Sequence, residues 1–193
     1  VFKTSDADET FAHLQGLAMA GDPPKAFTRP VVLPEGEKDA SFRTVAVRDG
    51  VFPGGRVYFC EHHTPELVWR PEWQSHGNGG QAMPDFVIAS TNHQEEAEAF
   101  AKLLRSNVSG DGDSLGVGFK GGQLTIMSPA AYGERYGASA SPMAGRASIF
   151  GALVIRTDSL DKIRAIASPA IDEAERVVVR EGSFDAVLEF VNR

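Results

Sequence analysis

The sequence predicts an α+β fold assembled from tandem strand–helix–three-strand (βαβββ) units. Three segments each combine the end of an apolar strand with a polar residue suited to begin a helix: residues 1–6, 87–92 and 154–159. Val154 follows Val87 by 67 positions, and the strand-like residues 121–127 follow the similar residues 54–60 by the same interval. Two landmarks with one period indicate an internal repeat, so the same elements should recur in the same order.

The first unit opens directly at Val1. Ser5 or Asp6 can cap a helix over residues 6–18, whose acidic first turn suits the helix dipole. Three strands, divided by turn residues, should follow this helix: 27–33, 42–48 and 56–63. In the other two copies apolar residues precede the equivalent valine. We therefore expect the first strand to be incomplete and this chain to be the later part of a longer protein, while the sequence does not decide whether an amino-terminal unit was removed.

The later units follow a long connector at residues 64–83 that is rich in Pro, Trp and Gly. The expected elements of the second unit are a strand at 85–90, a helix at 94–105 and strands near 107–109, 114–119 and 123–128. A short helix at 130–136 and a linker at 137–145 lead to the third unit, with a helix at 159–167 and strands at 175–179 and 183–191. These boundaries predict two domains, residues 1–80 with the connector and residues 84–193.

Composition restricts the classes of partner. The 193 residues carry a net charge of −7. Nucleic acid and anionic membranes select clustered Lys and Arg, so neither is expected as a partner. The sequence has no run of 18 apolar residues, which argues against a membrane span. The single cysteine, Cys60, excludes a disulfide within the chain and favours a cytoplasmic protein, although the start at Val1 leaves room for a removed targeting segment.

Side chains able to perform chemistry concentrate in one stretch: Glu61, His62, His63, Glu66, Trp69, Glu72, Trp73, His76 and Asn78. Side chains alternate faces along a strand, so Glu61 and His63 should share one face while His62 takes the other. Imidazole and carboxylate together can bind a borderline divalent metal. Glu61 and His63 are therefore the expected metal ligands.

A purely structural interpretation stands beside this one. The histidines can end a strand, the glutamates can form ordinary surface ion pairs, and Trp69 and Trp73 can brace the core. Each residue taken singly favours that interpretation, whereas the cluster as a whole favours binding. Glu189, in the final strand, is expected to face solvent, and Cys60 is expected to be a buried strand residue.

The repeat, together with residues 56–80 (RVYFCEHHTPELVWRPEWQSHGNGG), resembles the glyoxalase-like domain family of the vicinal oxygen chelate superfamily. That superfamily includes glyoxalase I, extradiol dioxygenases and bleomycin-resistance proteins. The resemblance implies curved mixed sheets that form a cup. It also implies a divalent metal on the concave face, held by His, Glu or Gln from the first and fourth strands of a unit.

The sequence departs from this pattern. Strands 85–90 and 148–157 carry no histidine, and Ser128 stands one period after Glu61. A third ligand for Glu61 and His63 is therefore expected from a unit outside this chain or from a partner chain.

Two functions are compatible with the resemblance. The first is a metal-dependent lyase, isomerase or dioxygenase-like enzyme acting on a small oxygenated molecule. Glu61, His62 and Glu66 would be its catalytic groups, and Trp69, Trp73, His76 and Asn78 would bind its substrate. The second is a non-catalytic binding protein of the bleomycin-resistance type that holds a small molecule in the same cup. A third interpretation is a scaffold whose paired units serve homodimerisation.

Overall fold

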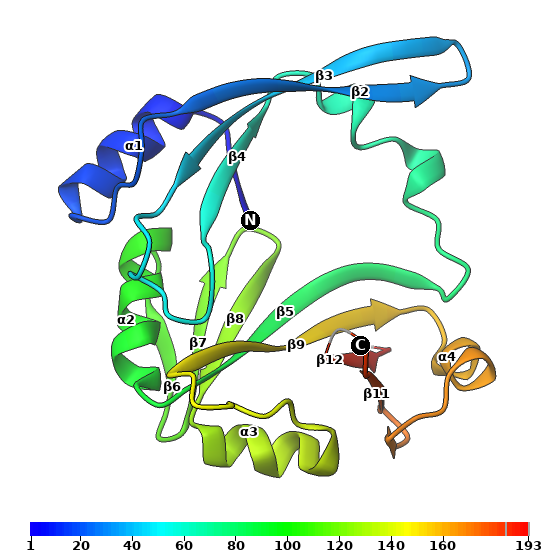
Figure 1. Ribbon diagram of the computed structural model, residues 1–193. Helices are drawn as coiled ribbons and strands as arrows, with labels where there is room; N and C mark the ends of the chain where they lie inside the picture. Colours follow the sequence, from blue (N-terminus) through cyan, green and yellow to red (C-terminus); the bar gives the residue numbers. More distant parts are fainter. Residues whose placement is uncertain (184, 193) are drawn as a thin grey trace. The chain divides into compact units, whose positions relative to one another are not determined.

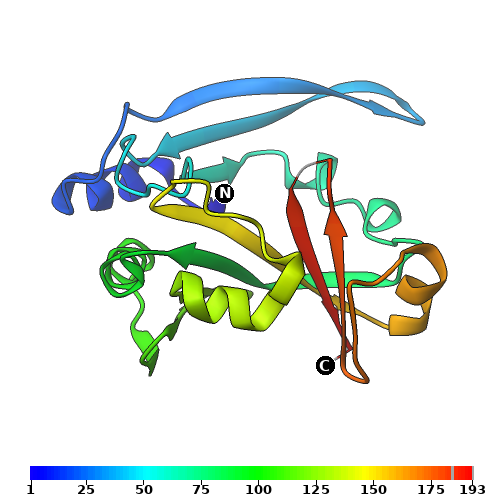
Figure 2. The same ribbon diagram turned by 60° about the horizontal axis from the view of Figure 1, so that its bottom comes forward.

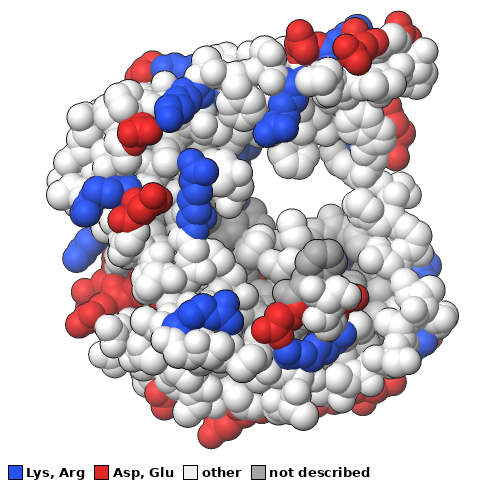
Figure 3. Space-filling view, in the orientation of Figure 1, with Lys and Arg blue, Asp and Glu red and all other residues white. Residues whose placement is uncertain are grey.

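The structure is a computed structural model that describes residues 1–183 and 185–192. It divides into two compact units, Val1–Gln74 and Ser75–Arg193. On the face shown in Figure 3, Lys and Arg are interspersed with Asp and Glu over both units. Within the described part of the chain, no helix is both long and apolar enough to span a membrane.

The first unit is one βαβββ block (Figure 1). Its elements are β1 (Phe2–Thr4), α1 (Ala7–Gly16), β2 (Lys25–Leu33), β3 (Gly36–Ala46) and β4 (Tyr58–His62), followed by the short 3₁₀ turns η1 (Pro65–Leu67) and η2 (Pro71–Trp73). The strand order is β1-β4-β3-β2, with β1 and β4 parallel and the other pairs antiparallel. As predicted, Asp6 caps α1, its side chain accepting a hydrogen bond of 2.9 Å from the Glu9 amide.

The β2–β3 hairpin is longer than expected. Leu33 pairs with Gly36, so only Pro34 and Glu35 form the turn, and Gly36 has a φ of 120° that favours glycine. The expected strand 42–48 thus overlaps the second half of β3, which runs from Gly36 to Ala46, and extends two residues beyond its end.

The second unit contains two further blocks. The first comprises β5 (Gly80–Ser90), α2 (His93–Leu104), β6 (Val108–Asp111), β7 (Ser114–Phe119) and β8 (Gly122–Met127). The second comprises β9 (Ser148–Thr157), α4 (Leu160–Ile166), β10 (Ile171–Asp172), β11 (Arg176–Glu181) and β12 (Ala186–Val191). The segment between the blocks forms α3 (Pro129–Tyr136) and η3 (Gly137–Ser139).

The two blocks share one sheet, with the order β10-β11-β12-β9-β5-β8-β7-β6. Within each block the first and fourth strands are parallel, as in the first unit, and the blocks join through the antiparallel pair β5–β9. The curved mixed sheets built from tandem βαβββ units confirm the predicted fold.

The two faces of this sheet are covered differently. Helix α2 packs on β5, β7 and β8, and helix α4 packs on β11 and β12. Helix α3 lies on the opposite face, called the inner face below, and appears in yellow-green in Figure 2. Its tyrosines, Tyr132 and Tyr136, belong to a core cluster with inner-face residues of β5, β8, β9, β11 and β12.

Helix α3 has clear local causes. Ser128 caps it through a hydrogen bond of 3.2 Å from the Ala131 amide, and Pro129 occupies its first turn. Gly151 of β9 lies under the ring of Tyr132, where an added Cβ would come within 2.6 Å of ring carbon Cε2. The Tyr132 hydroxyl donates a hydrogen bond of 2.8 Å to the Gly151 carbonyl. These contacts fix α3 against the sheet.

Candidate functional site

The start of the His- and Trp-rich segment follows the predicted alternation of side chains along β4. Glu61 of β4 lies on the α1 side of the first sheet, where its Oε2 accepts a hydrogen bond of 3.2 Å from the amide of Ala7. The same oxygen lies 3.6 Å from Nε2 of His63 and 3.8 Å from Nη1 of Arg43. Glu61 and His63 therefore come together, beside the first turn of α1.

This pair does not make a complete metal site. Zinc-type sites use three or four ligands, whereas the described residues contain no group of three or more His, Cys, Asp or Glu side chains able to hold an ion. Oε2 of Glu61 also already faces a backbone N–H and the guanidinium of Arg43, which opposes a second cation there. The residues present do not fit a divalent metal without further ligands.

His62 occupies the other face of β4. Its ring packs edge-on against Phe42 at 5.1 Å and stacks on Trp69 at 5.6 Å between ring centroids. Nδ1 is buried and has no hydrogen-bond partner among the described residues. Burial, and to a lesser degree the charge of Lys3, lower the pKa of His62. The imidazole is therefore neutral near pH 7 and is held by aromatic contacts.

Cys60 is buried beside it, as expected, and burial raises the pKa of its thiol. A raised pKa keeps the thiol protonated and unreactive. Nothing in this environment activates a nucleophile.

The remaining predicted site residues belong to both units, Glu66 and Trp73 to the first and His76 and Asn78 to the second. Glu66, Trp73 and His76 are exposed. Trp73 lies 5.5 Å under the guanidinium of Arg70, which also pairs with Glu72. Asn78 forms a turn in which its side-chain oxygen accepts a hydrogen bond from the Gly80 amide and its carbonyl accepts one from Thr157 Oγ1.

A second group of polar residues lies on the inner face of the second unit. Val154 of β9 is in register with Asp85 of β5 on one side and with Glu189 of β12 on the other. Asp85 is in register with Gln123 of β8. Side chains directly opposite one another in neighbouring strands share a face, so these four residues form one row across the sheet. Two strand spacings place the Cα atoms of Asp85 and Glu189 about 10 Å apart.

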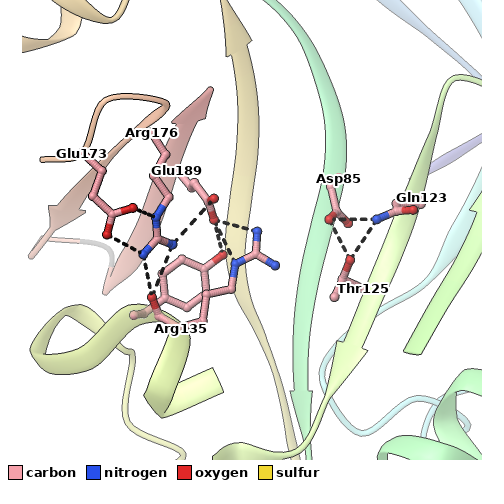
Figure 4. Close-up of polar contacts among 8 residues, drawn as sticks. Asp85, Gln123, Thr125, Arg135, Glu173, Arg176 and Glu189 are labelled. Atoms are coloured by element: carbon pink, nitrogen blue, oxygen red, sulfur yellow. Dashed lines mark hydrogen bonds and ion pairs between the residues drawn. The ribbon is translucent and has the colours of Figure 1, made fainter. Parts of the chain in front are cut away.

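Glu189 is only 2% exposed and is neutralised from α3. Its Oε2 accepts hydrogen bonds from Nε and Nη2 of Arg135, at 3.1 and 2.8 Å, and from the Tyr136 hydroxyl at 2.7 Å. Figure 4 shows the Arg135 guanidinium between Glu189 and the strand that carries Asp85. Arg176 lies behind this pair, with Nη1 3.9 Å from Oε1 of Glu189, and is itself bound to Glu173.

Asp85 is 8% exposed and has two neutral donors. Its Oδ2 accepts hydrogen bonds from Thr125 Oγ1 at 2.7 Å and from Gln123 Nε2 at 3.2 Å (Figure 4). Its other oxygen, Oδ1, is buried without a hydrogen-bond partner among the described residues. Leaving a buried polar atom unpaired costs about 1–3 kcal/mol, and more for a charged group. Such an atom calls for an explanation.

A cavity of about 420 Å³ opens over this row. Its walls combine polar and small apolar residues of the sheet with one residue of α3: Pro84, Asp85, Gly118, Gly122, Gln123, Arg135, Val154, Glu189 and Val191. The volume falls in the range of sites that bind small molecules, about 300–1,000 Å³.

Comparison with known proteins identifies the family. The family model described as a glyoxalase-like domain matches residues 1–104, which is more than half of the 193 residues. The chain belongs to the glyoxalase-like domain family. It is thereby a member of the vicinal oxygen chelate superfamily. No curated protein matches it.

Solved structures resemble this glyoxalase-like protein in fold. A hypothetical protein from Staphylococcus aureus aligns with a TM-score of 0.66 and 9% identity, covering 97% of this chain and 63% of that chain. The chain thus spans less than two thirds of that protein. A halotolerant catechol dioxygenase aligns with a TM-score of 0.49, 11% identity and coverages of 98% and 65%. Methylmalonyl-CoA epimerase from Mycobacterium tuberculosis aligns with a TM-score of 0.42, 12% identity and coverages of 58% and 88%.

The inner-face row of this glyoxalase-like protein corrects one expectation. The expectation that Glu189 faces solvent is wrong, because α3 covers the final strand and supplies Arg135 and Tyr136 to the carboxylate. Asp85 gave a weak signal, since it is an acidic residue directly before the apolar run 86–89 of β5. The positions of its neighbours depend on strand register, which a single sequence does not specify.

Proposed function

We propose that this glyoxalase-like protein binds a small polar molecule in the cavity between the inner face of its second unit and α3. The observation that carries the proposal is the buried carboxylate of Asp85, whose Oδ1 has no hydrogen-bond partner within the described chain, at the wall of a 420 Å³ cavity. A bound molecule that donates a hydrogen bond to this carboxylate would compensate for the burial of its charge.

The surroundings of Asp85 suit a binding site. Thr125 and Gln123 hold one carboxylate oxygen in place, so the group is oriented before a ligand arrives. Val154 and Val191 provide apolar wall, and Arg135, with its side chain 27% exposed, presents part of its guanidinium to the cavity. A few placed polar groups within an apolar lining are typical of small-molecule sites.

Binding without reaction and chemical transformation are both compatible with this geometry. A carboxylate held in this way is able to move a proton of a bound oxygenated molecule, which would make the protein an enzyme. Metal assistance by Glu61 and His63 would need ligands beyond this chain, so no step is assigned to a metal. Binding in the cavity is common to both alternatives.

A cavity-filling variant tests the proposal. Gly118 lines the cavity, and a Cβ added there would meet only Ser106 Oγ, at 3.8 Å. Gly118→Leu should therefore fill part of the cavity with little strain. Gly133→Leu is the matched control, because Gly133 lies on α3 outside the cavity lining and a Cβ there meets nothing within 4 Å.

The measurement is a screen of polar fragments by ligand-observed NMR. Fragments that bind the unmodified protein should lose binding to Gly118→Leu and keep it with Gly133→Leu. Equal binding to both variants, or no fragment binding to the folded protein at all, would overturn the proposal.

A further inference from the structure

We infer that the molecule held in this cavity carries a small protonated amine and that Asp85 binds it. The inference rests on the proposed function and specifies the ligand by its chemistry. It comes from the balance of charge around the cavity.

Asp85 lacks a counter-charge. Both of its hydrogen bonds come from neutral groups, Thr125 and Gln123, and both reach the same oxygen. Among the described residues, no Lys, Arg or His side chain lies within 4.0 Å of its carboxylate. A buried carboxylate without an opposite charge is costly, and a cation in the cavity would relieve that cost.

The nearest cation on the cavity wall is already engaged. Arg135 directs Nε and Nη2 to Oε2 of Glu189, where the Tyr136 hydroxyl adds a third donor. Arg176 in turn pairs with Glu173, at 2.8 Å. Each arginine is therefore matched by a glutamate, and the charge of Asp85 is the one left over among these residues.

An ammonium group suits the Asp85 carboxylate better than a hydroxyl group does. A primary ammonium is compact and carries three donors, so it is able to bond to the carboxylate on the cavity wall and still bond to a second acceptor. The ammonium also brings a full positive charge to the carboxylate, an attraction that an alcohol, which donates to the same carboxylate as a neutral group, does not supply. We therefore expect a primary amine to bind about tenfold more tightly than the alcohol of the same shape.

Three compounds of one size test the inference: n-propylamine, 1-propanol and propionate. Their dissociation constants are measured at pH 7 by chemical-shift titration with the unmodified protein, Asp85→Asn and Asp111→Asn. Asp85→Asn removes the charge at constant shape. Asp111 is an exposed residue of β6 and serves as the matched control.

The amine should bind best to the unmodified protein, lose its roughly tenfold advantage over the alcohol in Asp85→Asn, and keep it in Asp111→Asn. Alcohol or propionate binding as tightly as the amine would overturn the inference while leaving the proposed cavity intact, as would an advantage that survives Asp85→Asn. If Asp85→Asn does not fold, the affinities of the three compounds for the unmodified protein still test the inference. If the amine does not bind and no fragment loses binding in Gly118→Leu, both proposals are overturned.

Discussion

The hydroxyl of Tyr136 donates a hydrogen bond of 2.7 Å to the carboxylate of Glu189, and both side chains are buried beneath α3. Arg135 donates to the same oxygen, so three donors hold one anion in the core. A glutamate side chain is rarely buried this completely unless it is paired. The contact joins α3, between the two blocks, to β12, the last strand. The stability of the second unit therefore depends on the protonation state of the Tyr136 phenol.

Alkaline pH should destabilise the protein through Tyr136. Burial raises the pKa of this phenol far above its ordinary value of about 10; the charge of Arg135 opposes this shift, and the charge of Glu189 adds to it. Above about pH 10 the unfolded chain releases this proton while the folded chain keeps it. The free energy of unfolding should therefore fall by about 1.4 kcal/mol per pH unit from this group.

Urea unfolding at pH 8 to 11 measures this effect. In Tyr136→Phe the pH slope should be smaller by that amount, whereas Tyr58→Phe, in the first unit, should leave it unchanged. Identical slopes in all three proteins would show that Tyr136 ionises normally in the fold.

Gly151→Ala should destabilise the second unit. An added methyl group would lie 2.6 Å and 2.8 Å from ring carbons of Tyr132, whose position is fixed by hydrogen bonds to Gly151 and Ser141. Overpacking of this kind costs about 1–3 kcal/mol. Thermal or urea unfolding measures the change, with Gly133→Ala as a control that should not destabilise. A Gly151→Ala protein of unchanged stability would mean that α3 is free to move away from β9.

His62 should remain neutral to lower pH than an ordinary histidine. Burial and the charge of Lys3 both lower its pKa, so its contribution to stability is present above about pH 6.5 and is lost as the pH falls through the folded-state pKa. A proton NMR titration should give a pKa below 6.5 for His62, and Lys3→Gln should raise that pKa. A value at or above 6.5 in the unmodified protein would contradict the contacts seen with Phe42 and Trp69.

Any divalent metal that binds the first unit should depend on Glu61 and His63, the two groups that lie 3.6 Å apart beside α1. Glu61→Ala and His63→Ala should each abolish the binding while the protein stays folded. Metal titration followed by calorimetry, with circular dichroism for folding, gives the answer, and Glu66→Ala is the matched control at an exposed carboxylate. Retention of the ion in both variants would exclude this pair as ligands.

Much of the fold could be predicted from local signals. Asp6 caps α1, residues 130–136 lie within α3, and the order of elements is correct in the first two blocks, whereas the two-residue strand β10 of the third block was not predicted. These features depend on residues close together in the chain, or on the interval of 67 residues at which similar segments recur. The length of the β2–β3 hairpin was underestimated, because the exposed polar residues of early β3 do not alternate with buried ones.

The candidate site in the second unit could not be predicted in the same way. Asp85, Val154 and Glu189 are neighbours only because of the pairings of β5, β9 and β12. Alternation along β4 correctly grouped Glu61 with His63, but it could not show that their face carries α1. Strand register and helix placement are properties of the assembled unit, so they are invisible to a pattern within one strand.

Helix α3 lies between the two repeated blocks of the second unit and belongs to neither of them. The strands carry the architecture, while α3 contributes one residue, Arg135, to the wall of the cavity. A substitution on α3 therefore changes that wall and the partners of Glu189 without altering the strand pairings of the two blocks.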